Sequence, residues 1–221
     1  MTTVVHPAGP GWRRGGRPAT WWGRAWGRAV EEAAYDEQAL AAGRSLARAG
    51  AVGAVTTEAG RFAADVADGS ETCRVTGTLP VLDPTGRESL VEAVAAGGGR
   101  LAALLAGDLP HDLVEHAEEA GVELLPYGGE LVTGCTCRGW TDPCRHALAL
   151  LTRLTWLVEA DPLVLLHLRG LSREELLSRL HAGGPAGDAD EDLDVALDAA
   201  LRAAAVLRVL DDDHARIEHL L

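Results

Sequence analysis

Residues 135–146 read Cys135-Thr136-Cys137-Arg138-Gly139-Trp140-Thr141-Asp142-Pro143-Cys144-Arg145-His146. This stretch of twelve residues holds three of the chain's four cysteines and one of its eight histidines. Thiolates and an imidazole suit zinc, and structural zinc sites close a tetrahedron of four such ligands. Two tight pairs, C-x-C and C-x-H, are joined by six residues, enough chain to fold back and bring both pairs to one ion. The stretch therefore predicts one structural zinc, held by Cys135, Cys137, Cys144 and His146.

The same stretch predicts the start of a helix. Asp142 is a favourable N-cap, and proline suits the first helical position that follows it. The helix is expected to run to about Glu159, with an apolar stripe formed by Ala147, Leu150, Leu151, Leu154, Leu157 and Val158. In this register Cys144 lies in the first turn, where free backbone amides and the helix dipole favour a thiolate.

Three other interpretations of the cluster are weaker. A catalytic pair of Cys144 and His146 is disfavoured because residues two apart on a helix do not face each other. A redox disulfide within the C-x-C pair would leave Cys144 and His146 unexplained. Chance clustering would have to place four suitable ligands at a consistent spacing. We therefore expect a binding protein with a structural metal rather than an enzyme.

Upstream of the cluster, three short runs alternate apolar and polar residues, as half-buried strands do. They lie around residues 51–57, 61–66 and 72–79. The connections Glu58-Ala59-Gly60 and Asp68-Gly69-Ser70 are typical of hairpin turns. This pattern predicts an antiparallel meander with one apolar face. Cys73 falls on the inward side of the last run and is expected to be a buried, unreactive thiol.

Helical patterns surround this meander. Thr20 can cap a helix that runs to about Ala41, and Ser172 with Glu175 forms a capping box for another. Further helices are expected at residues 85–106, which Gly97-Gly98-Gly99 can break, at 109–120, after Asp161-Pro162, and at 190–210. The predicted fold is therefore α+β. A small antiparallel sheet with flanking helices is followed by a zinc knuckle that leads into a helical C-terminal part.

Composition divides the chain into four parts. Residues 1–19 are rich in Gly, Pro and Arg and are expected to form a mobile basic arm. Residues 20–126 are expected to form an N-terminal α+β domain, and residues 127–182 the zinc-finger segment with its helices. Residues 183–221 are expected to form a linker and an acidic C-terminal helix.

Charge is distributed unevenly along the chain of 221 residues. The net charge of −13 argues against a protein that coats nucleic acid with its whole surface. Residues 1–30 hold five arginines and no acid, which gives +5, whereas residues 185–221 hold ten acids and three arginines, which gives −7. No apolar run is long enough to span a membrane, and no secretory signal is seen. We therefore expect a cytoplasmic protein with reduced cysteines.

The pattern C-x-C-x6-C-x-H resembles the SWIM zinc finger. The resemblance to bacterial SWIM zinc-finger proteins extends over roughly residues 20–180, through Thr20-Trp21-Trp22-Gly23-Arg24-Ala25-Trp26, Gly43-Arg44-Ser45, Arg48-Ala49-Gly50 and Asp161-Pro162. Leu46 departs from it, because an aromatic residue is expected there, and the acidic C-terminal stretch lies outside it. The resemblance implies the same four zinc ligands and an interaction module for nucleic acid or protein. Because bacterial members are associated with Swi/Snf-type helicase ATPases, it also implies such a partner.

Three residues between and beside the ligands are candidate contacts to a partner. Arg138 and Arg145 could offer guanidinium groups to phosphates, and Trp140 could stack on a base. The alternative is that Trp140 packs over the zinc site while the arginines are only solvated. His111 and His116 could form a second metal site, although an exposed helix face fits them better.

Two functions remain open from the sequence. The first is an accessory protein that associates with DNA or RNA beside a helicase-like ATPase. The second is a protein–protein adaptor without nucleic-acid contact, which the net charge of −13 favours. Gly97-Gly98-Gly99 lacks the Lys and Ser/Thr of a phosphate-binding loop, so the chain shows no motif for nucleotide hydrolysis.

Overall fold

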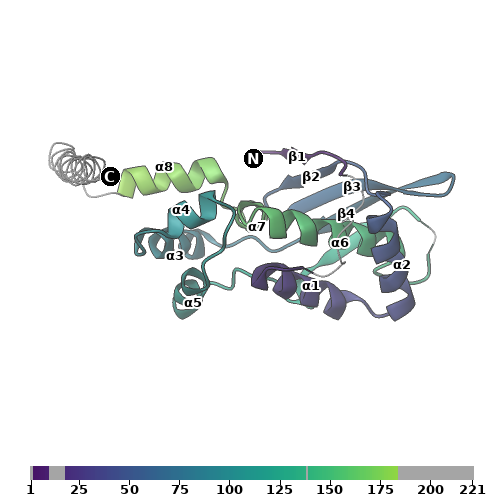
Figure 1. The fold of residues 1–221 in the computed structure, drawn as a ribbon, viewed down its shortest axis with the longest axis horizontal. Coiled ribbons are helices and arrows are strands. Elements are labelled where there is room, and N and C mark those ends of the chain that lie inside the picture. The colour runs from purple at the N-terminus through teal and green to yellow at the C-terminus, as the bar shows by residue number, and fades with distance from the viewer. Residues whose placement is uncertain (1, 10–17, 138, 184–221) are drawn as a thin grey trace, which may run out of the picture. The chain divides into compact units, whose positions relative to one another are not determined.

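The computed structural model describes residues 2–9, 18–137 and 139–183 (Figure 1). The chain divides into two compact units, residues 1–179 and 180–221, and nearly all described residues belong to the first. The linker and acidic helix expected at residues 183–221 lie outside the described residues, apart from Gly183 at the end of the last helix.

The first unit is built on a five-stranded antiparallel sheet in the order β1-β2-β3-β4-β5. Its strands are β1 (Val4–His6), β2 (Val55–Glu58), β3 (Arg61–Asp68), β4 (Glu71–Thr78) and β5 (Val132–Cys135). The helices are α1 (Trp21–Ala33), α2 (Glu37–Arg48), α3 (Pro84–Ala95), α4 (Arg100–Leu105), α5 (His111–Glu119), α6 (Arg145–Ala160), α7 (Leu163–Leu168) and α8 (Arg173–Gly183), with a 3-10 turn, η1 (Gly128–Glu130). The predicted α+β fold class is confirmed.

One face of the sheet is apolar and is covered by helices. Phe62 and Val66 on β3 and Val75 on β4 are buried, whereas their neighbours Arg61 and Arg74 are exposed. Helix α6 packs on this face against β3, β4 and β5, and α1 and α2 pack on the other side of α6 (Figure 1). A helix enclosed in this way buries most of its side chains, and Leu148, Leu150, Leu151 and Leu154 of α6 are fully buried.

Both predicted hairpin turns and the helix caps at Thr20 and Ser172 are confirmed. Gly60 and Gly69 occupy the two hairpin turns with φ of +72° and +62°, a region that glycine enters without steric cost. Thr20 caps α1 by accepting a hydrogen bond from the Gly23 amide. Ser172 accepts a hydrogen bond of 3.2 Å from the Glu175 amide at the start of α8.

The prediction of a mobile arm at residues 1–19 is wrong for residues 4–6. Val4–His6 pairs with β2 and forms the edge strand β1, because two β-branched residues suit a strand and His6 Nε2 lies 3.1 Å from Thr57 Oγ1. Arg13, Arg14 and Arg17 lie outside the described residues.

Two expected helices are each divided in two. The helix expected from Thr20 to Ala41 ends at Ala33, because Asp36 is extended and its side chain caps α2 by accepting from the Gln38 amide at 2.8 Å. The glycines at 97–99 break the helix expected over residues 85–106, which becomes α3 and α4.

The boundary expected between residues 126 and 127 does not separate two units. Strand β5, from the zinc-finger segment, pairs with β4 from the N-terminal part, and Val75 of β4 faces Cys135 of β5. The two parts therefore share one sheet, within the unit of residues 1–179.

A buried arginine ties the end of α7 to three other segments. The Arg169 guanidinium donates to the Leu124 and Pro80 carbonyl oxygens at 2.9 Å each. It also forms a two-pronged ion pair with the Glu130 carboxylate, with both N–O distances at 2.9 Å. Both side chains are largely buried, so each depends on the other for its charge compensation.

We expect Arg169→Ala to lower the free energy of unfolding by about 3–5 kcal/mol, because it leaves the Glu130 carboxylate buried and unpaired. Urea denaturation measures this loss. The control is Arg179→Ala, which removes the half-exposed pair with Glu175 on α8 and should cost no more than about 0.5 kcal/mol. Equal effects of the two substitutions would contradict the role given to Arg169.

Candidate metal centre

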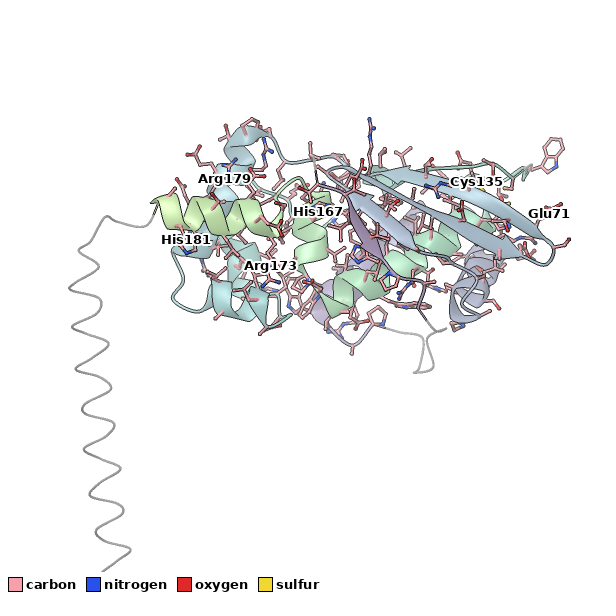
Figure 2. All side chains as sticks on the ribbon, turned by 90° about the horizontal axis from the view of Figure 1, so that it is seen from above. Glu71, Cys135, His167, Arg173, Arg179 and His181 are labelled. Carbon is pink, nitrogen blue, oxygen red and sulfur yellow. The ribbon has the colours of Figure 1, made fainter. Side chains whose placement is uncertain are left out.

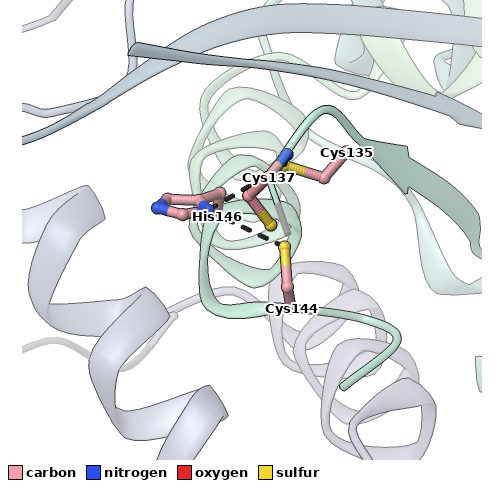
Figure 3. Close-up of side chains that lie close together, drawn as sticks. All are labelled: Cys135, Cys137, Cys144 and His146. Carbon is pink, nitrogen blue, oxygen red and sulfur yellow. Dashed lines mark hydrogen bonds between the residues drawn. The ribbon is translucent and has the colours of Figure 1, made fainter. Parts of the chain in front are cut away.

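The four predicted ligands come from one strand end, one loop and one helix start. Cys135 is the last residue of β5, and Cys137 follows it by two residues. Cys144 is the N-cap of α6, and His146 is the second residue of that helix. The three Sγ atoms and one histidine nitrogen all lie within 4.8 Å of one another (Figure 3). The prediction that these four side chains come together where one metal ion could bind them all is confirmed.

The spacing of the ligand atoms fits zinc. His146 Nδ1 lies 3.8 Å from Cys144 Sγ and 3.9 Å from Cys135 Sγ. In a tetrahedron with Zn–S of about 2.3 Å and Zn–N of about 2.0 Å, a sulfur and a nitrogen are about 3.5 Å apart. The arrangement is therefore that of a single zinc with three thiolates and one imidazole.

The helix begins later than expected. Asp142 was predicted as its N-cap, but α6 begins at Arg145 with Cys144 at the cap position. Residues 141–143 belong instead to the loop that turns Cys144 toward the other ligands. His146 thereby lies in the first turn of α6, where its ring reaches the sulfur atoms.

The thiols differ in how readily they lose a proton. Burial raises the pKa of Cys137, but a hydrogen bond from the Gly139 backbone and contacts with His146 and the other thiols outweigh it and lower the pKa to about 7. Burial raises the pKa of Cys135. A bound metal ion deprotonates coordinating thiols outright, so the ion's own charge supplies what Cys135 lacks.

Asp68 orients the histidine ligand from outside the cluster. His146 Nε2 lies 3.0 Å from Asp68 Oδ2, and because a carboxylate only accepts, Nε2 donates and Nδ1 is free to face the sulfurs. Arg145 also pairs with Asp68, at 2.5 Å. The hydrogen bond to His146, followed by the charge of Arg145, lowers the pKa of Asp68.

Asp68 was not identified from the sequence as part of the site. It ends β3, 78 residues before His146, and nothing in its local pattern distinguishes it from an ordinary turn residue. The β3–β4 hairpin brings it to the cluster, and Figure 2 shows Glu71 of this hairpin at the same end of the sheet as Cys135.

Strand β4 holds the C-x-C pair, Cys135 and Cys137, in place. Arg74 of β4 and Thr136 exchange two hydrogen bonds of 3.0 Å, one to the Thr136 side chain and one between backbones. They continue the β4–β5 pairing past Cys135. Cys73, also on β4, is buried as predicted, and burial raises the pKa of its thiol.

Gly43 lets α2 approach the start of α6. A Cβ atom at this position would lie 2.7 Å from Leu148 Cβ and 2.8 Å from the Arg145 carbonyl oxygen, both closer than atoms can pack. The Gly43-Arg44-Ser45 stretch noted in the sequence therefore has a packing role beside the ligands.

The other candidate residues that the structure describes differ in their surroundings. Trp140 is fully exposed, so the interpretation that it packs over the zinc site is wrong. Arg145 is held by Asp68, and Arg138 lies outside the described residues. His111 pairs with Glu115 at 3.2 Å. Within the described residues, the four zinc ligands are the one group of this kind that could hold a metal ion.

Comparisons with known proteins agree with this site. The family model of the SWIM zinc finger matches residues 122–154, which include all four ligands. An uncharacterized protein of Mycobacterium tuberculosis is 30% identical over 179 residues, which make up 80% of this chain and 64% of the relative. The chain thus spans only part of that relative's length. No solved structure matches the chain. Of the helices that the structure describes, none combines the length and the apolar character that a membrane crossing requires.

We expect Cys135→Ser and His146→Ala each to abolish stoichiometric zinc and to lower the melting temperature, because a structural zinc contributes its binding energy to folding. Elemental analysis and thermal melts measure the two effects. Cys73→Ala should keep its zinc, because Cys73 is not one of the four ligands. Full zinc occupancy in both ligand variants would refute the assignment.

We expect Asp68→Asn to weaken zinc binding by about 10- to 100-fold, because the charge that orients His146 is lost. Competition with a chromophoric chelator measures the affinity. Asp65→Asn is a matched control on the same strand, since the Asp65 side chain forms an exposed pair with Arg74. A similar loss in both variants would argue against a specific role for Asp68.

Proposed function

The chain carries a SWIM zinc finger at residues 122–154, and from this premise we propose that it is a zinc-stabilised module that associates with nucleic acid in the cytoplasm. The observation that supports this proposal is the exposed indole of Trp140. Its loop is held on both sides by metal ligands, Cys137 before it and Cys144 after it. A large aromatic side chain presented to solvent on an anchored loop is suited to stack on an unpaired base.

We propose a structural rather than a catalytic role for the metal. Three cysteines and one histidine complete a tetrahedral zinc site, so no position remains for water or substrate. The ion then holds the end of β5 against the first turn of α6. The loop that carries Trp140 is the part whose shape depends on this link.

The overall charge sets a condition on nucleic-acid binding. With a net charge of −13, the molecule repels a polyanion except where arginines gather locally. Arg145 lies between the ligands Cys144 and His146, but its guanidinium already pairs with Asp68 at 2.5 Å. The indole of Trp140 therefore supplies stacking in this proposal, while most of the phosphate attraction has to come from other arginines.

A protein–protein adaptor is the second candidate. The net charge of −13 favours it, and an exposed tryptophan is also a frequent energetic centre of protein interfaces. The proposed helicase-like ATPase partner rests on the resemblance to bacterial SWIM proteins. Co-purification from native lysate with wild-type chain and with Trp140→Ala distinguishes a partner that contacts this loop from one that binds elsewhere.

We expect Trp140→Ala to weaken binding of a labelled single-stranded oligonucleotide by about 10- to 100-fold, the range for losing one stacked base. Fluorescence anisotropy at low salt measures this. Zinc content and melting temperature should not change, because the indole makes no buried contact.

Tyr35→Ala provides the matched control, because Tyr35 is also an exposed aromatic residue and lies between α1 and α2. It should bind the oligonucleotide as the wild type does. Absence of binding by wild-type, zinc-loaded protein to single-stranded and duplex DNA and RNA would reject the nucleic-acid proposal in favour of the adaptor.

A further inference from the structure

We propose that a groove between α1, α2 and α6 binds the sugar–phosphate backbone of nucleic acid, an inference that rests on the proposed function. The groove has a volume of about 420 Å³. Its charged lining residues are four arginines and one glutamate: Arg24, Arg28, Arg44, Arg48 and Glu31. Together they give the groove a net charge of +3. In a molecule of net charge −13, this is a local reversal of sign.

The helices place these arginines on facing sides of the groove. Arg24 and Arg28 are four residues apart on α1, and Arg44 and Arg48 are four residues apart on α2. Residues with this spacing lie on the same face of a helix. Each helix therefore presents a pair of guanidinium groups to the space between them.

Two of the four arginines have no partner among the residues that the structure describes. Arg44 pairs with Glu31, and Arg24 donates to the Ala19 carbonyl oxygen. Arg28 and Arg48 make no hydrogen bond or ion pair with any residue that the structure describes. Each also lies four residues from another arginine on its own helix, Arg24 or Arg44, and like charges at this spacing repel each other. Their guanidinium groups are available to an anion from outside.

The floor of the groove is rigid. It is formed by Thr155 and Trp156 of α6, both buried. Gly27 of α1 lies close above, since a Cβ there would be 3.9 Å from the Thr155 side chain. The arginines are thus mounted on two helices that pack on a common buried helix. Such a support preorganises a site and reduces the entropy lost on binding.

Phosphate is the anion that best fits this arrangement. A guanidinium is planar, always charged, and offers paired donors that match phosphate oxygens. An available guanidinium on each of two helices suits neighbouring phosphates of a chain rather than a single carboxylate. Backbone contacts of this type position a nucleic acid without reading its sequence.

The groove is connected to the zinc knuckle through two helices. Thr152 and Trp156, which line the groove, follow Cys144 by eight and twelve residues on α6, or about 12–18 Å at 1.5 Å per residue. About four to five nucleotides of a duplex strand cover this distance at about 3.4 Å each. On α2, Ala39 and Ala42 lie beside the ligands, and Arg44 and Arg48 beside the groove. A strand in the groove is therefore within reach of the knuckle.

The test replaces the two unpaired arginines in the full-length, zinc-loaded protein. Arg28→Gln/Arg48→Gln is titrated against a labelled single-stranded DNA oligonucleotide and its duplex between about 50 and 200 mM salt. We expect an affinity about tenfold or more below that of the wild type at low salt. The plot of log affinity against log salt has a negative slope, which should become shallower in the variant. The expected change is about 1.4 for the single strand and about 1.8 for the duplex, which corresponds to the loss of two phosphate contacts.

The matched control is Arg61→Gln/Arg173→Gln, which removes the same charge from two exposed arginines outside the groove. It should keep the wild-type salt slope. A further variant, Arg28→Lys/Arg48→Lys, retains the charge but not the paired donors, and should keep the slope while losing part of the affinity.

The outcomes separate this proposal from the proposed function. Wild-type affinity and slope in the glutamine variant would overturn the groove while nucleic-acid binding stands. A lowered melting temperature with unchanged affinity would also overturn it, because the two arginines would then serve the stability of the fold and not the binding of an anion. If wild-type protein binds neither oligonucleotide, both the proposed function and the groove are rejected.

Discussion

The burial of α6 between the apolar face of the sheet and the pair α1 and α2 is the constraint on which the rest of the structure depends. Four leucines of this helix are fully buried, and each such side chain contributes about 1.5–3 kcal/mol relative to exposure. Gly43 shows how tight this packing is, because no side chain fits between α2 and the first turns of α6. The start of α6 is thereby fixed. Its first turn carries two zinc ligands, and its middle forms the floor of the arginine groove.

The metal centre connects three segments that are distant in the sequence. Strand β5 supplies Cys135, the start of α6 supplies Cys144 and His146, and the β3–β4 hairpin supplies Asp68 behind the histidine. The hairpin would otherwise be an exposed extension of the sheet. Through Asp68 it becomes part of the metal environment, so the sheet, the knuckle and the buried helix act as one structural element.

Features with local causes could be predicted from the sequence. The zinc ligands lie within twelve residues, and their chemistry follows from residue type and spacing. The meander follows from alternation within single strands. Asp68 could not be recognised, because its role depends on pairing across 78 residues. The edge strand at Val4–His6 is too short to show a period, and the partners of Arg169 come from three other segments. The exposure of Trp140 could not be predicted either, because it depends on the path of the loop between Cys137 and Cys144.

The contacts around His146 also imply an order of assembly. His146 and Cys135 are 11 residues apart, whereas His146 and Asp68 are 78 apart. Closing a short loop costs less chain entropy than closing a long one, and local contacts form faster. The turn that brings the ligands together can therefore form early, as a local nucleus. We expect the docking of this nucleus on the β3–β4 hairpin to follow, and it adds β5 to the edge of the sheet.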